Sequence, residues 1–204
     1  KGKEIRRYYQ IGVFFYSTDM EGNPIVESAF PWTQEPMPWI DEIALQARLE
    51  ERIVKGVDPE TGEEVDQKKP FPVFIENVQP DGGTPMGSMY DKAYEVLKPI
   101  SENHQDCNPG SFLNVSDGFP TPLPGQSEEE MKKHILTSAE RVKALKTEWG
   151  NVLLWNLLFA PGENPPILFP SSSEGLTPSE QLMFDCASEI PEGFYSQIEQ
   201  TMKI

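Results

Sequence analysis

The stretch Phe112-Leu113-Asn114-Val115-Ser116-Asp117-Gly118-Phe119-Pro120-Thr121 decides the fold of this chain. Its apolar beginning predicts a short buried strand, and its Asp-Gly pair followed by Pro predicts a sharp turn where that strand ends. Asp117 therefore lies at the carboxyl end of the strand, the edge where ligands bind in open α/β sheets. An aspartate in such a turn commonly bonds only its own backbone, so a function for Asp117 needs support from a second segment.

That second segment lies upstream, in Asp81-Gly82-Gly83-Thr84-Pro85-Met86-Gly87. The glycine pair allows a tight loop, and Thr84 before Pro85 is typical of a helix N-cap followed by the first helical residue. Because apolar side chains then recur with a period near 3.6, we expect a helix from Thr84 to about Asn103. Its positive dipole end would favour an anionic group beside Asp117. One hydroxyl and one carboxylate are thus expected at one sheet edge.

These segments resemble the second and third motifs of the metal-ion-dependent adhesion site (MIDAS) of von Willebrand factor A (VWA) domains. Gly83-Thr84-Pro85-Met86 opens a helix, and Val115 to Thr121 ends a strand, in the order and spacing of that family. The similarity runs from Ile11–Tyr16 to Phe184–Pro191 and is greatest to bacterial intracellular members. It implies a doubly wound, mostly parallel sheet with helices on both faces, a three-layer α/β sandwich, in a single domain over residues 1–204.

The resemblance also implies a metal site. Thr84 would supply a hydroxyl ligand and Asp117 a carboxylate ligand to Mg²⁺, or to Mn²⁺ or Ca²⁺, with one position open for an acidic residue of a protein partner. Gly83, Ser116 and Gly118 would lie near the metal and contact that partner or another anion. The family's first motif, D-x-S-x-S, is not in this sequence. We therefore expect the first strand and helix to lie upstream of it or on a second chain, and the metal to depend on that segment.

Three functions are compatible with this pattern. The first is a metal-dependent protein–protein interaction module. The second is a metal-free scaffold subunit that keeps the fold and is completed by a missing strand or a partner chain. The third and least favoured is a hydrolase that uses Asp117, because the sequence carries no P-loop, no G-x-S-x-G and no local Ser-His-Asp or Cys-His arrangement. We expect a protein that is not an enzyme.

The composition of the chain argues against two classes of binding partner. A formal net charge of −16 argues against nucleic acid and anionic membranes, because phosphate binding needs clustered Lys and Arg. No apolar run is long enough to span a bilayer and no signal-like segment opens the sequence, which predicts a cytoplasmic protein. Cys107 and Cys186 match no metal or redox spacing and are expected to be free thiols.

The region around residues 31–70 predicts a Pro-rich, charged insertion that contains a hairpin. Ile40–Val57 is compatible with a helix or a strand, because Leu45, Leu49 and Ile53 recur every four residues whereas Arg52–Val57 alternates, and we expect a hairpin at its end. Asp58-Pro59-Glu60-Thr61-Gly62 predicts a turn, and the charged residues on both sides of it predict exposed hairpin arms.

After the Asp117 turn, the chain predicts alternating helices and strands. Capping boxes at Ser127 and Thr177 open two helices, and Asn151–Phe159 is expected to be a buried strand. His134 has no second His or Cys nearby and is expected at the surface. The helix that begins after Ser127 is expected to bury Met131, Ile135, Ala139, Val142, Leu145 and Trp149.

Overall fold

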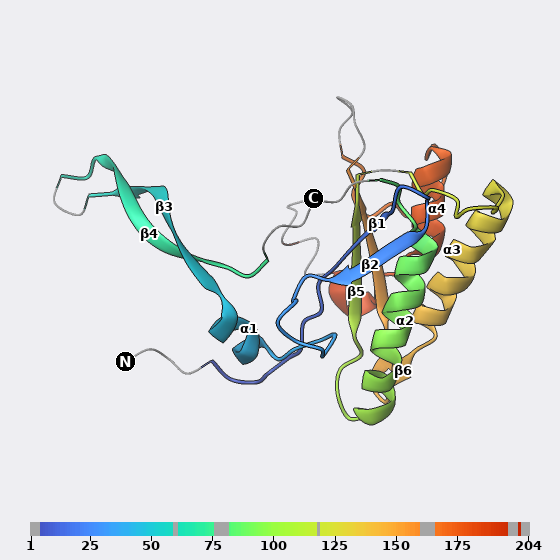
Figure 1. Ribbon diagram of the computed structural model, residues 1–204, viewed down its shortest axis with the longest axis horizontal. Helices are drawn as coiled ribbons and strands as arrows, with labels where there is room; N and C mark the ends of the chain where they lie inside the picture. Colours follow the sequence, from blue (N-terminus) through green and yellow to red (C-terminus); the bar gives the residue numbers. More distant parts are fainter. Residues whose placement is uncertain are drawn as a thin grey trace. The chain divides into compact units, whose positions relative to one another are not determined.

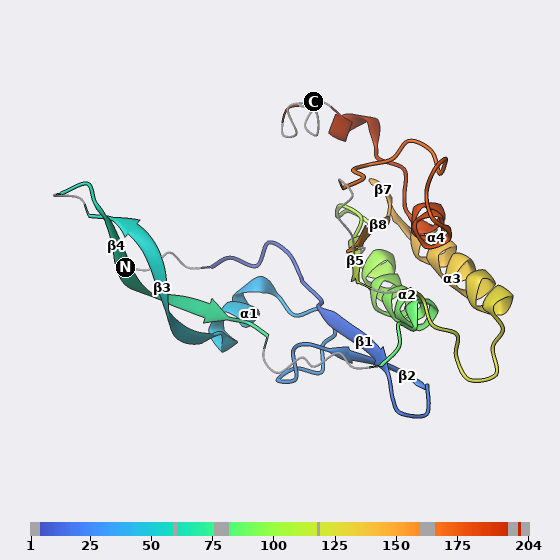
Figure 2. The same ribbon diagram turned by 90° about the horizontal axis from the view of Figure 1, so that it is seen from above.

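The computed structural model describes residues 5–58, 61–75, 82–117, 119–159, 166–195 and 200. The chain divides into two compact units, one made of Lys1–Phe15 and Glu27–Pro80 and the other of Tyr16–Val26 and Asp81–Ile204. We call them unit 1 and unit 2. Strands β1 (Phe14–Thr18) and β2 (Pro24–Ser28) pair with each other, and the division between the units falls inside both strands. Figures 1 and 2 together carry the labels of these elements.

Unit 1 holds the N-terminal segment against helix α1 (Ile40–Gln46). The amide of Ile11 donates to the Pro38 carbonyl (3.1 Å), and the amide of Ile40 donates to the Tyr9 carbonyl (3.2 Å). Arg7 binds two carboxylates in the first turn of α1, where negative charge also suits the helix dipole. The buried side chains of this unit include Ala29, Phe30, Pro38 and Ile43.

The rest of unit 1 is a long hairpin of β3 (Arg48–Val57) and β4 (Glu64–Val73). The two strands pair antiparallel from Arg48–Val73 to Val57–Glu64, and Figure 2 shows them as a twisted two-stranded ribbon. The predicted hairpin is therefore confirmed. The ambiguous stretch 40–57 forms both structures in turn, because α1 ends at Gln46, the backbone is extended at Ala47, and β3 begins at Arg48.

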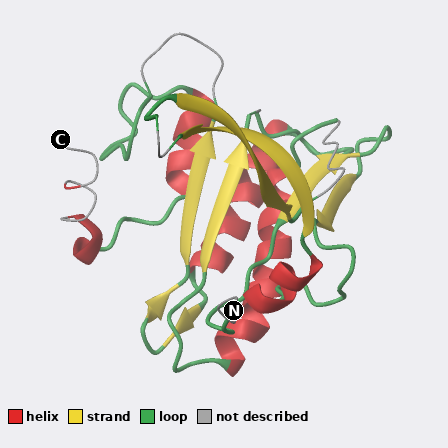
Figure 3. Cartoon of the chain, turned by 90° about the vertical axis from the view of Figure 1, so that its left-hand side faces the viewer, coloured by secondary structure: helices red, strands yellow, loops and turns green. Residues whose placement is uncertain are grey.

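Unit 2 contains the parallel strand pair β5 (Ser111–Ser116) and β8 (Leu153–Leu158), with Ser111 opposite Leu153 and Ser116 opposite Leu158. Helices α2 (Met86–Asn103) and α3 (Glu128–Lys143) pack side by side along one face of this pair, as Figures 1 and 3 show. Helix α4 (Pro178–Cys186) contacts α3 and β8. A short hairpin of β6 (Lys146–Thr147) and β7 (Gly150–Asn151) connects α3 to β8.

The predicted mixed α/β class is confirmed, with helices beside a parallel pair of strands. Each sheet in the described part of the chain has two strands, so the continuous doubly wound sheet of a three-layer sandwich is not formed there. Among the described helices, none combines the length and the apolar character that a membrane span requires.

The prediction that β5 is buried holds for one face only. Asn114 is 2% exposed and the Phe112 ring packs edge-on against Tyr90, whereas Leu113 is 58% exposed and Val115 is 48% exposed. The end of the neighbouring strand shows the same imbalance, with Phe159 60% exposed. Because successive side chains point to opposite faces of a sheet, helices α2 and α3 cover only one of the two apolar faces.

A buried hydrogen-bond network joins the elements of unit 2. The Tyr90 hydroxyl on α2 donates to Oδ1 of Asn156 (2.8 Å), which also accepts from Nδ2 of Asn114 (3.0 Å). Asn156 donates to the Met183 carbonyl on α4 (2.8 Å), and the Tyr16 hydroxyl on β1 donates to Oδ1 of Asn114 (2.8 Å). Buried amides must be satisfied in this way, so the network fixes how these five elements meet.

Both predicted capping boxes are confirmed. The Ser127 and Glu130 side chains each accept from the other's backbone amide, and Thr177 and Glu180 do the same. Hydrogen bonds from Ser127 lower the pKa of the Glu130 carboxyl. The expectation for Trp149 is wrong, because α3 ends at Lys143 and Trp149 lies in the β6–β7 turn, 70% exposed. Of the predicted core positions of this helix, those found buried are Met131, Ile135, Ala139 and Val142.

Replacement of Tyr90 by Phe should lower the free energy of unfolding by about 1 kcal/mol, because it removes one buried hydrogen bond and leaves Asn156 Oδ1 with its second donor. Tyr94→Phe is the matched control, since it deletes a hydroxyl from the same helix without removing a described hydrogen bond, and should change stability by less than about 0.5 kcal/mol. Urea unfolding of both variants measures the difference; equal losses would contradict the network.

The two cysteines are free thiols, as predicted, and differ in exposure. Burial raises the pKa of the Cys186 thiol to about 12, whereas Cys107 is exposed. A thiol-specific reagent at pH 8 should therefore modify one cysteine per native chain rapidly and both in denaturant, because the thiolate is the reactive form. Raising the pH from 8 to 10 should leave the modification of Cys186 slow in the folded protein, since both pH values lie below the pKa of its thiol. Rapid modification of the folded Cys107→Ser variant would show that Cys186 is accessible and would contradict its burial.

Candidate functional site

The candidate metal ligand Thr84 lies one position outside the expected place on its helix. Helix α2 begins at Met86 with Pro85 as its N-cap residue, and no side chain caps it. The expectation that Thr84 is the N-cap is therefore wrong. The physical reason is the backbone of Pro85, whose ψ of 66° lies outside the helical range, so that Pro85 is the flanking residue and the helix begins one residue later. The Thr84 carbonyl instead accepts from the amide of Met86 (2.8 Å), and Thr84 remains half-buried at the start of the helix.

The loop before α2 is attached to the end of strand β1. The amide of Gly83 donates to Oγ1 of Thr18 at 2.7 Å. A Cβ atom at Gly82 would lie 2.5 Å from the Thr18 carbonyl oxygen, and Gly82 has a φ of +98°. Only glycine accommodates both the contact and the backbone conformation, which explains the glycine pair at this position.

The same loop is attached to the segment that follows β5. The amide of Thr84 donates to Oγ1 of Thr121 (2.9 Å), and the amide of Thr121 donates back to the Thr84 carbonyl (3.0 Å). A Cβ atom at Gly83 would lie 2.9 to 3.0 Å from three atoms of the Thr121 side chain. Thr121 therefore fastens the turn that contains Asp117 to the loop that contains Thr84. The motif quoted for β5 ends at this threonine, although its role was not apparent from the sequence.

Asp117 directly follows the last residue of β5 and its side chain is exposed, as expected for the carboxyl end of a strand. Among the described residues, no hydrogen bond or ion pair engages its carboxylate. Ser116 is 7% exposed and its carbonyl accepts from the amide of Phe159 (2.8 Å). Gly118, the remaining predicted contact residue, lies outside the described residues.

Tyr16 provides electrostatic evidence about this edge. Burial raises the pKa of its hydroxyl, and the negative charge of Asp117 raises it further, while hydrogen bonds with Ser116 and Asn114 lower it. The Tyr16 side chain on β1 therefore lies within the electrostatic range of Asp117. Thr18, at the end of the same strand, contacts the loop of Thr84. Three segments that are far apart in the sequence thus converge at one edge, which we call the carboxyl-end site and which contains Thr18, Gly83, Thr84, Asp117 and Thr121.

The carboxyl-end site fits a hard cation in the kind of donors that it offers. Thr84 carries a hydroxyl and Asp117 a carboxylate, and oxygen ligands of these kinds are the ones that Mg²⁺, Mn²⁺ and Ca²⁺ prefer. In the part of the chain that the structure describes, no group of three or more His, Cys, Asp or Glu side chains is placed to hold a metal. Hydroxyls, water and ligands from outside this chain would have to complete the six oxygens that Mg²⁺ takes.

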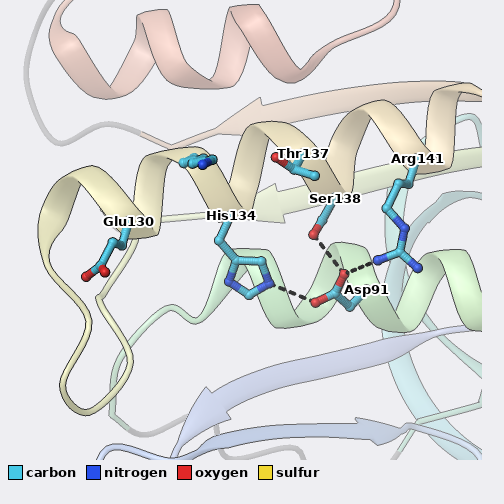
Figure 4. Close-up of a pocket in the computed structure, with 7 residues that line it drawn as sticks. Asp91, Glu130, His134, Thr137, Ser138 and Arg141 are labelled. Atoms are coloured by element: carbon cyan, nitrogen blue, oxygen red, sulfur yellow. Dashed lines mark hydrogen bonds and ion pairs between the residues drawn. The ribbon is translucent and has the colours of Figure 1, made fainter.

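A second polar cluster, which sequence reasoning missed, lies between α2 and α3 (Figure 4). Asp91 accepts from Nε2 of His134 (2.8 Å), from Oγ of Ser138 (2.7 Å) and from Arg141 (3.0 Å). The Arg141 guanidinium also lies 4.1 Å from the centre of the Tyr94 ring, a cation–π contact. The sequence signal that could have identified this cluster is the helical spacing of His134, Ser138 and Arg141, which places them on one face of α3.

The Asp91 cluster is arranged as a clamp between helices. It borders a shallow depression of about 360 Å³. The Ser138 hydroxyl donates to Asp91 and not to His134, so no base is placed to activate it as a nucleophile. His134 is half-buried and bonded, whereas the sequence predicted an ordinary surface residue. The cluster therefore stabilises the contact between α2 and α3.

Comparisons of this chain with protein-family models, with curated proteins and with solved structures find no match.

Replacing Thr121 by Val should loosen the carboxyl-end site, because Val preserves the shape of Thr but cannot accept from the Thr84 amide. Hydrogen exchange at the Thr84 amide should accelerate by about tenfold or more, which corresponds to the loss of one hydrogen bond of roughly 1.4 kcal/mol. Thr121→Ser keeps the acceptor and should exchange close to the wild-type rate. Equal exchange in the Val and Ser variants would show that the Thr121 hydroxyl does not hold this loop.

Proposed function

We propose that this chain is a metal-ion-dependent protein-binding module of the VWA type, with its ligand-binding edge at the carboxyl-end site. The observation that carries the proposal is the reciprocal bonding of Thr84 and Thr121, which draws the loop of Thr84 to the turn of Asp117. A hydroxyl and a carboxylate at one strand edge are suited to hold a hard cation. A bound cation would leave a position for a carboxylate of the partner.

Because the chain is acidic, an acidic group of a partner could bind at this site only if a metal ion lay between the two. A formal net charge of −16 repels acidic ligands, and Asp117 adds a further negative charge at the site itself. A divalent cation would reverse the local charge and attract a carboxylate. In this module Asp117 and Thr84 would hold the metal, Thr121 and Thr18 would position the loop of Thr84, and Gly83, Ser116 and Gly118 would lie near the partner.

The finer fold is part of the same proposal. In the described residues, β5 and β8 have helices on one face and exposed Leu113, Val115 and Leu157 on the other. Parallel sheets are almost always covered on both faces. We propose that a further strand and helix, supplied upstream or by a second chain, complete a doubly wound sheet and contribute the D-x-S-x-S ligands.

Mn²⁺ binding tests the metal site directly. Water-proton relaxation should detect weak Mn²⁺ binding to the chain, with a dissociation constant on the order of 1 mM because the ligand set is small, and Mg²⁺ should compete. Asp117→Asn and Thr84→Val should each weaken Mn²⁺ binding by about tenfold or more, while circular dichroism stays unchanged. Asp106→Asn removes an exposed acid from a different loop and serves as the control for non-specific attraction. Equal affinity in Asp117→Asn and Asp106→Asn would refute the site.

The exposed apolar face of β5 and β8 favours a second candidate function, a metal-free scaffold subunit. In that case the face itself is the interface, and assembly with the partner chain is insensitive to Asp117→Ala but is lost in Val115→Asp. The metal-dependent module predicts the opposite sensitivity to Asp117 and a requirement for divalent cation. Partner binding measured with and without a chelator separates the two.

A further inference from the structure

The β3–β4 hairpin of unit 1 has unpaired backbone groups along its edges in the described residues. In the described residues its sheet has two strands only, so each strand has one unpaired edge. A two-stranded hairpin is marginally stable alone in water, and an unpaired edge offers its amides and carbonyls to another strand. The two edges of this hairpin differ in their ability to accept one.

The hydrogen-bonding phase of the hairpin follows from its turn. The amide of Asp58 donates to the Glu63 carbonyl at 2.9 Å, and Asp58 opposite Glu63 continues the register of the ladder. Since backbone groups alternate in direction along a strand, the even-numbered residues of β3 face β4 and the odd-numbered residues face away. The amides and carbonyls at Leu49, Ile53 and Val57 therefore point to the free edge of β3.

Two prolines in β4 remove amide donors from the other free edge of the hairpin. Pro70 and Pro72 lie opposite Glu51 and Leu49, at positions whose amides would point away from β3. Proline has no N–H, so the outer edge of β4 lacks two of its donors, a common protection against unwanted pairing. Strand β3 has no proline between Arg48 and Val57. The edge of β3 is therefore the one able to pair.

The odd-numbered residues of β3 read Leu49, Glu51, Ile53, Lys55 and Val57. The three apolar members are 66%, 67% and 63% exposed, in chain order. This pattern allows two copies of β3 to pair with each other. In an antiparallel pair centred on Ile53, apolar residues lie opposite apolar residues and positive charges lie opposite negative charges. No other choice of centre within β3 brings Glu51 opposite Lys55.

We propose that two copies of this chain associate through β3, antiparallel and with a two-fold axis at Ile53. The hairpins then form one four-stranded sheet in the order β4, β3, β3 and β4. Leu49 lies opposite Val57 of the second copy, Glu51 lies opposite Lys55, and the two Ile53 side chains are neighbours across the axis. The residues that pair in this register are the ones whose amides and carbonyls are directed to the free edge, so pattern and hydrogen-bonding phase agree.

Existing ion pairs are compatible with this register. Lys55 lies 2.8 Å from Asp66 and Lys68 lies 3.6 Å from Glu51, all on the same face of the hairpin. In the four-stranded sheet the charges of both copies form one alternating row across the strands. Each of the two central charges keeps its own partner and gains another, and opposite charges in such rows favour the pairing.

Charge reversal tests both the association and its register. By sedimentation equilibrium the wild-type chain should reach about twice the 23.0 kDa chain mass. Glu51→Lys and Lys55→Glu each place two like-charge pairs across the axis and should weaken self-association by about tenfold or more. A mixture of the two variants should recover the wild-type affinity as a heterodimer, because every cross-strand pair is again opposite in charge. Circular dichroism of each variant checks that the hairpin is retained.

Ile53→Pro provides an independent test, because it removes an outward-pointing amide without removing a bond to β4. It should abolish self-association, while Ile53→Val should preserve it. A monomeric wild-type chain at about 100 μM, a mixture that stays monomeric, or dimers that survive Ile53→Pro would each overturn the proposal. None of these readouts involves divalent cations, so the outcome is distinct from that of the carboxyl-end site.

Discussion

The buried hydrogen bonds around Asn114 and Asn156 are the constraint on which the rest of unit 2 depends. These two amides lie opposite each other on the parallel strands, where apolar side chains are the usual choice. Their polar atoms are satisfied by Tyr16 from β1, Tyr90 from α2 and the Met183 carbonyl from α4. A shift of any of these elements leaves a buried amide unpaired, which costs about 1 to 3 kcal/mol. The network therefore sets the register of strands and helices more strictly than apolar packing would.

The carboxyl-end site depends on this frame. Asn114 lies three residues before Asp117, and Tyr16 lies two residues before Thr18, so the bond between Asn114 and Tyr16 aligns the ends of β1 and β5. Gly82 and Gly83 then allow the loop before α2 to approach Thr18 and Thr121 closely. Rigid elements below the site and close backbone contacts around it are what a ligand-binding edge needs, because the donor groups are held before the ligand arrives.

Unit 1 follows a different physical logic. Its hairpin has few buried side chains and exposes apolar residues along β3, so association in place of an internal core is the proposed source of its order. The prolines of β4 and the reverse-complementary pattern of β3 direct that association to one edge and one register. The proposed metal site and the proposed self-association use separate residues, so the two proposals assign surfaces of unlike chemistry to one chain.

The sequence by itself determined the local elements whose signals are short-range. The local elements present as predicted are the capping boxes at Ser127 and Thr177, the hairpin of β3 and β4, and the strand that ends before Asp117, all of which depend on neighbouring residues. Tertiary structure alone decided the meeting of Thr121 with Thr84 and the clamp of Asp91 on α3, since these partners are tens of residues apart. It also decided the exposure of Leu113 and Trp149. An apolar pattern records which faces favour burial, whereas burial itself depends on which other elements are there to cover them.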